Sequence, residues 1–591
     1  MVLDADGPSA GLATDSRHGT RDQLLRAKPP ISRGARPTTS PEGLIGNSTS
    51  GATELRAQPP SPVGDNAPGA AASQAAGDLV FRVAVRIAPR RSAGTGTATV
   101  GLSIKRYLQP FERELAKLEV IGLGLTDGIH HHSSFIRRSQ RLSYFDLVDA
   151  PPSSPLTQAL RESATASNGH ARPMAQRRVL RFGPHGFHEY RGKFFPQLVR
   201  SLCNAASLEK GATVLDPMCG SGTTLVEARA LDLKALGIDR NPLSRLISQV
   251  KTDAVGWTKE VRSDVESALD EVRPSRSAEL PWDSTDTAYL SRWFHPDALQ
   301  DVGKIVRMLS LLEEERARDF ASVCLSNVLR QVSYQKEDDL RVRKVRKTYS
   351  KGDAYSLYQR EVERNMTSIA RLVDVDGGHS APFHVKDGDA RHAERAFPQA
   401  KGRVDAIITS PPYAMALPYL DTDRLSLIAL GLLGRANHRK AEDEMIGTRE
   451  ITERKRRQEW ERYERHRAEL PGQVSKVIDR LAVVYHGEGI GFRRRNLPAL
   501  LARYCLDMQD VLRNMHRMLA PDAPAFVVVG TNSTVINGSR FDIETDILTM
   551  QIAEGLGFEA DSPINMELLV SRDAFKKNRG AREQILRLRK A

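Results

Sequence analysis

The pattern of apolar and polar positions divides the chain into stretches with different predicted structures. Residues 1–77 contain few large apolar side chains and many Gly, Ala, Pro and Ser residues. Such a stretch cannot bury enough surface to offset its ordering entropy, so we predict that it is disordered. Residues 78–176 open with "DLVFRVAVRIAPRR", whose period of two predicts a strand, and continue with the helical pattern of "RYLQPFERELAKLEVIGLG". We interpret this stretch as an N-terminal extension to which the sequence assigns no role.

From residue 177 onward, apolar strands alternate with amphipathic helices. Residues 177–260 contain "GATVLDPMCGSGTTLVEARALDLKALGIDRNP", which predicts strand, glycine loop, helix and strand, the opening of a doubly wound α/β sheet. Residues 261–375 are helical by period and interrupt that sheet as an insertion. The alternating pattern resumes over residues 376–591, although the charged stretch 435–495 predicts an exposed helical insertion. The expected fold is therefore an α/β, doubly wound, Rossmann-like sheet with a helical insertion.

Composition narrows the class of protein. The chain has 591 residues, four cysteines and a formal net charge of +13. The cysteines form no CxxC pair, which argues against a disulfide framework and against a metal site. Neither an apolar run of about 20 residues nor a secretory leader is apparent, so we expect a cytoplasmic protein without a membrane partner. A basic surplus on such a protein makes a polyanion the first partner to consider.

The glycine loop carries the first candidate chemistry. Asp216 ends a predicted strand, Gly220 and Gly222 follow in the turn, and Asp239 ends the next strand. Glycines allow the backbone to approach a ligand, and an acid about 20 residues further on is placed to hold ribose hydroxyls. The loop lacks both the GxxxxGK[ST] pattern and the third glycine of a dinucleotide fingerprint. An adenosine cofactor without a pyrophosphate fits better, and S-adenosyl-L-methionine is the common one.

The second candidate site is "TSPPY", residues 409–413. Two consecutive prolines end a strand and fix a rigid turn, so the residue that follows is presented at a sheet edge. That residue is Tyr413, and Thr409 and Ser410 precede the turn. The pattern predicts a rigid aromatic surface beside hydroxyl groups.

With these residues in view, the chain resembles the amino-group DNA methyltransferases, which methylate the exocyclic nitrogen of cytosine (N4) or adenine (N6). The resemblance rests on "FHEYRGKFFPQLVRSL" (187–202), "DPMCGSGTT" (216–224) and "TSPPY", in that order, with a weaker match at "GDA" (388–390). It implies a methyltransferase domain in two parts, 177–260 and 376–591. It implies cofactor contacts from Lys193, Phe194, Phe195, Asp216, Pro217, Cys219, Gly220, Ser221, Gly222, Thr223, Asp239 and Asp389. It implies catalytic roles for Thr409, Ser410, Pro411, Pro412 and Tyr413.

The chemistry of such enzymes gives each catalytic residue a role. A target base must leave the duplex stack before its amino group can meet a methyl donor, and Tyr413 would stack on the flipped base. Acceptors at Ser410 and the Pro411 carbonyl would hold the amino protons. Ser410 favours N4 of cytosine over N6 of adenine, because adenine enzymes more often have Asp at this position. No Pro-Cys pair exists in the chain, which argues against methylation of a cytosine ring carbon.

The resemblance implies double-stranded DNA as partner, a nucleoid-associated location, and a restriction or defence-system protein as a second candidate partner. Candidate phosphate contacts lie in two basic clusters, Arg341, Arg343, Lys344, Arg346 and Lys347 in the helical insertion and Arg493, Arg494 and Arg495 further on. A solvated helix face explains the first cluster equally well. Two alternatives stay open: an RNA methyltransferase acting on a base amino group, and a non-catalytic nucleic-acid-binding protein with a decayed methyltransferase fold.

Overall fold

A computed structural model describes most of the chain from residue 80 onward. The described residues are 80–87, 96–105, 107–126, 129–139, 141–148, 180–190, 192–273, 277, 279–337, 342–376, 379–414, 419–448, 450–485, 491–536, 539–566 and 583–591. The predicted disordered stretch 1–77 lies outside them.

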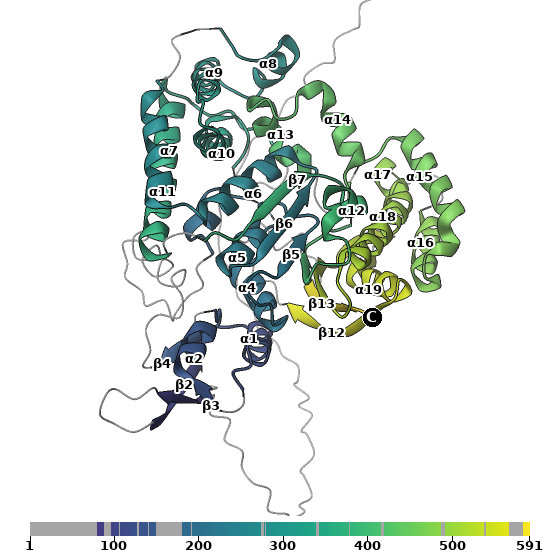
Figure 1. The fold of residues 1–591 in the computed structure, drawn as a ribbon. Coiled ribbons are helices and arrows are strands. Elements are labelled where there is room, and N and C mark those ends of the chain that lie inside the picture. Colours follow the sequence, from purple (N-terminus) through teal and green to yellow (C-terminus); the bar gives the residue numbers. More distant parts are fainter. Residues whose placement is uncertain are drawn as a thin grey trace, which may run out of the picture. The chain divides into compact units, whose positions relative to one another are not determined.

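A seven-stranded sheet forms the centre of the described structure, with strand order β12-β13-β9-β8-β5-β6-β7. Its strands are β5 (Thr213–Asp216), β6 (Lys234–Asp239), β7 (Phe383–Asp387), β8 (Ala406–Thr409), β9 (Pro524–Gly530), β12 (Phe558–Met566) and β13 (Glu583–Lys590). The five strands from β9 to β7 are parallel, and β13 runs antiparallel to both β9 and β12. The predicted doubly wound α/β fold is confirmed (Figure 1).

Alternation along the strands supplies the sheet with two apolar faces. In β9, Ala525, Val527 and Val529 point into one hydrophobic core, whereas Phe526 and Val528 point into another. The first core is filled by helices α18 (Leu497–Met518) and α19 (Thr545–Gly555), and the second by α4 (Pro196–Ala205) and α5 (Thr223–Ala230). Parallel strands covered by helices on both faces read as continuous apolar runs, which explains the sequence pattern of "AFVVVG".

A helical layer with its own core separates β6 from β7 in the sequence. It follows α6 (Pro242–Ala254) and comprises α7 (Lys259–Glu271), α8 (Ser284–Leu290), α9 (Pro296–Ser310), α10 (Glu315–Val332) and α11 (Asp353–Asp376). Apolar residues at helical spacing on α9, α10 and α11 pack together with α6. The same core includes α13 (Tyr419–Ala429), the helix that follows the TSPPY motif. The helical layer therefore packs against the element next to the candidate catalytic residues.

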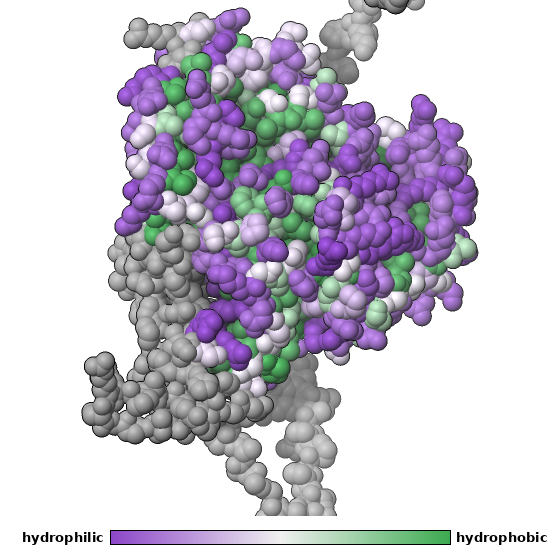
Figure 2. Space-filling view, viewed as in Figure 1, coloured by the Kyte–Doolittle hydropathy of each residue, from purple (hydrophilic) through white to green (hydrophobic). Residues whose placement is uncertain are grey.

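The charged stretch 435–495 differs from the exposed helix that its polarity predicts. It contains α14 (Arg435–Glu444), α15 (Glu453–His466), α16 (Gly472–Val484) and α17 (Phe492–Arg495). Tyr463, Val474, Ile478 and Leu481 are buried in the core that α18 shares. Few apolar positions suffice because each helix buries a single narrow stripe, while the outer side of α14–α16 is hydrophilic (Figure 2).

The N-terminal extension forms a small sheet of order β3-β1-β2-β4 and two helices. Its elements are β1 (Val80–Ile87), β2 (Gly96–Ile104), α1 (Pro110–Gly122), β3 (Ile129–His131), α2 (His132–Ser139) and β4 (Phe145–Val148). Helix α1 packs on α4, and Asn204 donates from Nδ2 to the buried Glu119 carboxylate at 2.8 Å. Gly122 permits this approach, because an added Cβ would lie 2.1 Å from the carbonyl oxygen of Asn204.

The close approach of α1 and α4 makes Gly122 a stability determinant. Substitution Gly122→Ala forces the two backbones apart, so we expect the free energy of unfolding to fall by about 1–3 kcal/mol. Urea unfolding followed by circular dichroism measures this loss. Gly472→Ala is the matched control, since Gly472 begins α16 and an added Cβ meets no atom within 4 Å. Equal stability of the two variants would show that the α1–α4 contact is not tight.

Candidate active site

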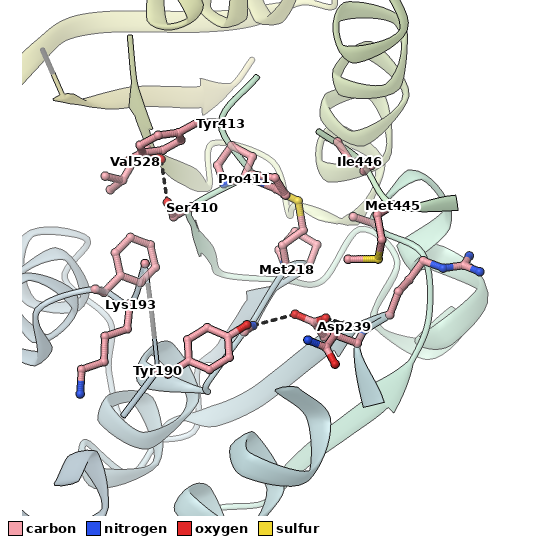
Figure 3. A pocket seen from close by; sticks show the side chains of 18 of the residues that line it. Tyr190, Lys193, Met218, Asp239, Ser410, Pro411, Tyr413, Met445, Ile446 and Val528 are labelled. Atoms are coloured by element: carbon pink, nitrogen blue, oxygen red, sulfur yellow. Dashed lines mark hydrogen bonds between the residues drawn. The ribbon is translucent and has the colours of Figure 1, made fainter. Parts of the chain in front are cut away.

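The sheet reverses its direction of winding between β5 and β8. The chain proceeds from β5 to β6 and β7 on one side, and from β8 to β9 on the other. In such sheets a crevice opens at the carboxyl ends of the two strands that flank the reversal. A cavity of about 230 Å³ lies there, and Figure 3 shows Tyr413 and Asp239 at its opposite ends. Its walls come from both candidate motifs and from segments far away in the sequence.

The glycine loop turns sharply between β5 and α5. Gly220 and Gly222 have φ angles of 50° and 77°, a conformation that side chains rarely adopt. An added Cβ on Gly222 would lie 2.4 Å from Oγ of Ser248, so α6 packs directly on the loop backbone. The loop is thereby held in one conformation beneath the cavity.

Asp239 ties the loop to the end of β6. Its Oδ2 accepts from the Gly220 N–H at 2.9 Å, and its Oδ1 accepts from the Asn241 N–H at 2.8 Å. Burial raises the pKa of this carboxyl, while the two backbone donors lower it. Each carboxylate oxygen can accept a second hydrogen bond, so Asp239 can still receive hydroxyl donors from the cavity that it lines.

Asp216 and Thr409 join the two motifs. Strands β5 and β8 pair in parallel with Leu215 opposite Ile407, so Asp216 and Thr409 both lie at the carboxyl ends of these neighbouring strands. The buried Thr409 hydroxyl donates to Oδ1 of Asp216 at 2.7 Å. Burial outweighs the opposing effect of the Thr409 hydrogen bond and raises the pKa of Asp216 to about 6. Both side chains are buried beneath the cavity floor, so their role in this structure is to fix the motifs to one another.

The TSPPY turn presents an oriented hydroxyl and an aromatic ring. Ser410 donates its proton to the Val528 carbonyl at 3.0 Å, which leaves its oxygen lone pairs as acceptors. The Tyr413 hydroxyl donates to the Glu583 carboxylate, and its ring lies against Gly530, where an added Cβ would be 2.7 Å from Cε2. Burial raises the pKa of Glu583, and the bond to Tyr413 lowers it. The ring is therefore held from the side and at its tip.

Asp389 lines the cavity but is occupied by arginines. Its Oδ1 accepts from the backbone N–H and from Nε of Arg391, and its Oδ2 accepts from a guanidinium nitrogen of Arg391 and one of Arg240. Burial opposes ionisation, but Arg391 outweighs it and lowers the pKa of Asp389. Four donors fill the acceptor capacity of a carboxylate, so a direct bond to a ligand requires one arginine to leave.

A segment from the charged stretch closes the cavity near Asp239. Met445 and Ile446 lie in its wall, and Figure 3 shows the Met445 side chain entering beside Asp239. Glu444 is paired with Arg240, and Gly447 lies so close to Pro412 that an added Cβ would be 2.9 Å from its Cβ. This segment therefore contacts both motifs.

The block at 187–202 forms another wall. Phe194, Phe195 and Lys193 line the cavity together with Tyr190, whose hydroxyl bonds Ser244 at 2.7 Å. Lys193 donates from Nζ to the His185 carbonyl at 3.0 Å, and burial lowers its pKa to about 8. Its ammonium is thus used in holding the segment together.

The structure brings most of the predicted site residues together. Pro217, Gly220, Asp239, Asp389 and the residues from Ser410 to Tyr413 are in the cavity wall. Cys219, Ser221 and Thr223 are buried in and below the glycine loop. Residues that the sequence analysis missed also line the cavity, namely Tyr190, Met218, Arg240, Asn241, Met445, Ile446, Val528, Met566 and Glu583. Tyr190 and Met218 stood inside quoted motifs, whereas nothing in the charged stretch pointed to Met445.

The predicted basic residues lie apart from the cavity wall. Arg343, Lys344 and Arg346 are exposed, and Lys347 is half-buried against Glu337 at 2.7 Å. Arg494 and Arg495 are exposed on α17, where Arg493 also lies. Arg341 lies outside the described residues.

The four cysteines are buried free thiols. Within the described ranges, no group of His, Cys, Asp or Glu is arranged to hold a metal ion. Among the helices described, none combines the length and apolar character needed to cross a lipid bilayer.

Comparisons with known proteins relate part of the chain to methyltransferases. Residues 188–272 match a family model described as "UPF0020: RMKL-like, methyltransferase domain". The chain is 43% identical over 67 residues to the Type II methyltransferase M.MjaII of Methanocaldococcus jannaschii, a match that covers 11% of this chain and 12% of that protein. It is 22% identical over 399 residues to the Type II methyltransferase M.AvaI of Nostoc sp., covering 63% of this chain and 78% of that protein. The chain carries a methyltransferase domain related to Type II methyltransferases, which confirms the predicted relationship.

A shorter match is to a tRNA-modifying enzyme. The chain is 42% identical over 48 residues to the tRNA (guanine(10)-N2)-dimethyltransferase of Methanocaldococcus jannaschii, covering 8% of this chain and 14% of that protein. Among solved structures, the rRNA methyltransferase AviRa of Streptomyces viridochromogenes shares 10% identity over 68% of this chain and 89% of that chain, with a TM-score of 0.27. That structural likeness is too low to support an argument about function.

Asp239 both holds the glycine loop and lines the cavity, so ligand binding should be sensitive to its substitution. Asp239→Asn removes the charge and places an amide against one of two backbone donors, so we expect the dissociation constant for S-adenosyl-L-methionine to rise about 10–100-fold. Isothermal titration calorimetry measures this change. Asp405→Asn is the matched control, because Asp405 likewise accepts from a backbone N–H, that of Thr213, but at the amino end of β5, away from the glycine loop. An unchanged affinity in Asp239→Asn would remove Asp239 from the binding site.

The raised pKa of Asp216 predicts a pH-dependent stability difference. The pKa of Asp216 is about 6 in the folded protein, against about 3.9 for an aspartate in the unfolded chain, so the folded protein binds the carboxyl proton more tightly. The stability gained from this proton is complete below pH 4 and is lost as the pH rises through about 6. Asp216→Asn avoids that loss. Between pH 4.5 and 7.5 we expect its free energy of unfolding to improve relative to wild type by about 1–3 kcal/mol. Parallel urea titrations at both pH values test this, and a constant difference would contradict it.

Proposed function

We propose that this protein is an S-adenosyl-L-methionine-dependent DNA methyltransferase that modifies the exocyclic amino group of a flipped base. The observation that carries the proposal is a single cavity that connects the glycine loop and Asp239 with Ser410 and Tyr413. One end of the cavity suits a nucleoside and the other a planar base.

The residues at the loop end fit S-adenosyl-L-methionine. Asp239 keeps free lone pairs for ribose hydroxyls, and Gly220 brings the loop backbone to the cavity wall without a side chain of its own. Phe194, Phe195 and Met445 provide apolar surface for the remainder of the molecule. When bound, this cofactor supplies an electrophilic methyl group on a sulfonium. Because Asp389 is filled by Arg391 and Arg240, we assign it to holding the cavity wall rather than to direct adenine recognition.

The residues at the TSPPY end fit the target base. Tyr413 offers a ring face, and stacking of a base on an aromatic side chain is worth about 1–3 kcal/mol, which offsets part of the cost of unstacking. Ser410 already donates its proton to Val528, so its oxygen can only accept from the amino group of the base. The hydrogen bond from Thr409 to Asp216 fixes this turn relative to the glycine loop. Rate enhancement then comes mainly from positioning two reactants.

The substrate is proposed to be double-stranded DNA, with N4 of cytosine as the favoured target. The relationship to Type II methyltransferases supports DNA, and Ser410 before the two prolines supports cytosine. A restriction or defence-system protein is the proposed functional partner. The second candidate, RNA methylation at a base amino group, draws support from the match to the tRNA methyltransferase.

The decisive experiment supplies methyl-labelled S-adenosyl-L-methionine with unmethylated genomic DNA or with total RNA. After digestion to nucleosides, mass spectrometry locates the label. Label on the cytosine or adenine amino group of DNA supports the proposal and identifies the base. Label on RNA alone replaces the proposal with the second candidate. Cofactor binding without label on either polymer would favour a decayed enzyme.

The placement of Tyr413 predicts a separation of turnover from cofactor binding. Tyr413→Ala removes the ring face, so we expect kcat on DNA to fall about 10–100-fold while cofactor affinity changes less than twofold. Tyr413→Phe keeps the ring and loses only the bond to Glu583, so its kcat should lie between that of the wild-type protein and that of Tyr413→Ala. Parallel loss of cofactor affinity in Tyr413→Ala would show that Tyr413 is structural.

A further inference from the structure

Part of the predicted basic cluster forms a hairpin in the helical layer. Residues 334–337 and 342–347, called here the basic hairpin, pair through hydrogen bonds from Lys336 N to the Arg343 carbonyl (2.8 Å) and from Val345 N to the Tyr334 carbonyl (2.7 Å). Its base is fixed by a third bond, from Tyr334 N to the Trp293 carbonyl at 2.7 Å. The helical face predicted as an equal alternative for this cluster is not what the structure forms, since residues 342–350 contain no helix.

Most cations of the hairpin are exposed, whereas Lys347 is half-buried and pairs with Glu337. In the part of the chain that the structure describes, Lys336, Lys344 and Arg346 have no acid within ion-pair distance. On α15, by contrast, Lys455 pairs with Glu459 at 3.0 Å, as expected of a solvated helix. Unpaired, exposed cations gain most from a polyanion, because binding releases its condensed counterions.

A second cavity, of about 310 Å³, opens at the base of the hairpin. Its walls include Tyr334, Tyr349, His295, Lys347, Asp353 and Arg360. The rings of His295 and Tyr349 are stacked at 6.1 Å, and Lys344 lies 5.4 Å above the Tyr334 ring. Aromatic faces and cations at one place suit the sugar-phosphate and bases of a nucleic acid strand.

The hairpin base is also connected to the helix beside the reaction centre. Arg424, on α13, lies 5.8 Å from the Trp293 ring and 5.3 Å from the Tyr289 ring. Helix α13 follows Tyr413 in the sequence and packs with α8 and α9 in one core. The hairpin is thus fixed to the same framework that carries the TSPPY turn.

We propose that the basic hairpin and the cavity at its base bind the phosphate backbone of the DNA that carries the target base. This inference rests on the proposed function and adds to it a substrate-holding surface away from the reaction centre. Phosphate contacts position a duplex without reading its sequence, so the hairpin contributes affinity and register rather than base choice.

The test measures the salt dependence of DNA binding by the full-length protein. In the double variant Lys344→Gln/Arg346→Gln, we expect the slope of log K against log [salt] to fall by about two, roughly 0.9 per lost phosphate contact. KM for DNA should rise while kcat stays near the wild-type value. Arg360→Gln tests the cavity separately, with an expected slope change of about one.

The matched control is Arg439→Gln/Arg456→Gln, which removes two surface cations that pair with Asp443 and Glu453 on their own helices. We expect its slope to equal that of wild type. An equal reduction in both double variants, or none in the hairpin variant, overturns the proposal. A reduction seen with RNA and absent with DNA overturns it as well.

Methyl transfer to DNA by the wild-type protein is recorded in parallel, together with thermal stability and cofactor affinity of each variant. If the wild-type protein methylates DNA and the salt slope of the hairpin variant equals that of wild type, only the proposed DNA contact of the hairpin is rejected. Absence of wild-type transfer to DNA rejects the proposed function independently of the slope.

Discussion

The hydrogen bond from Thr409 to Asp216 is the interaction on which the site depends. It joins the ends of β8 and β5, two neighbouring parallel strands at which the sheet reverses its winding. Because both groups are buried, neither can exchange its partner for water without a penalty. The glycine loop and the TSPPY turn are therefore held at a fixed separation, which a transfer between two bound reactants requires.

Around this link, distant segments complete the cavity. Glu583 from β13 holds the hydroxyl of Tyr413, and Gly530 from β9 leaves room for its ring. Met445 comes from the charged stretch and enters beside Asp239, while Arg240 connects Glu444 with Asp389. Burial raises and pairing lowers the pKa of both Glu583 and Asp389, and the arginines decide the outcome for Asp389, whose pKa is lowered. Ion pairs thus hold together the cavity wall near Asp239.

Charge outside the cavity divides into two kinds. On α15 the cations largely face acids, and such surface pairs contribute little to stability or to recognition. In the basic hairpin, Lys336, Lys344 and Arg346 have no such partner among the residues that the structure describes, which distinguishes a solvated helix from a surface suited to a polyanion. The overall surplus of +13 does not make that distinction.

The sequence by itself determined the fold class, the position of the glycine loop and the rigid TSPPY turn. These depend on local physics: strand alternation, backbone angles open to glycine, and the stiffness of two prolines. Only the tertiary structure decided that Asp216 binds Thr409, that Asp389 is filled by arginines, and that Met445 and Glu583 line the cavity. Those facts arise from pairing between strands and helices far apart in the chain, and the periodicity of a segment carries no information about which distant segment it will contact.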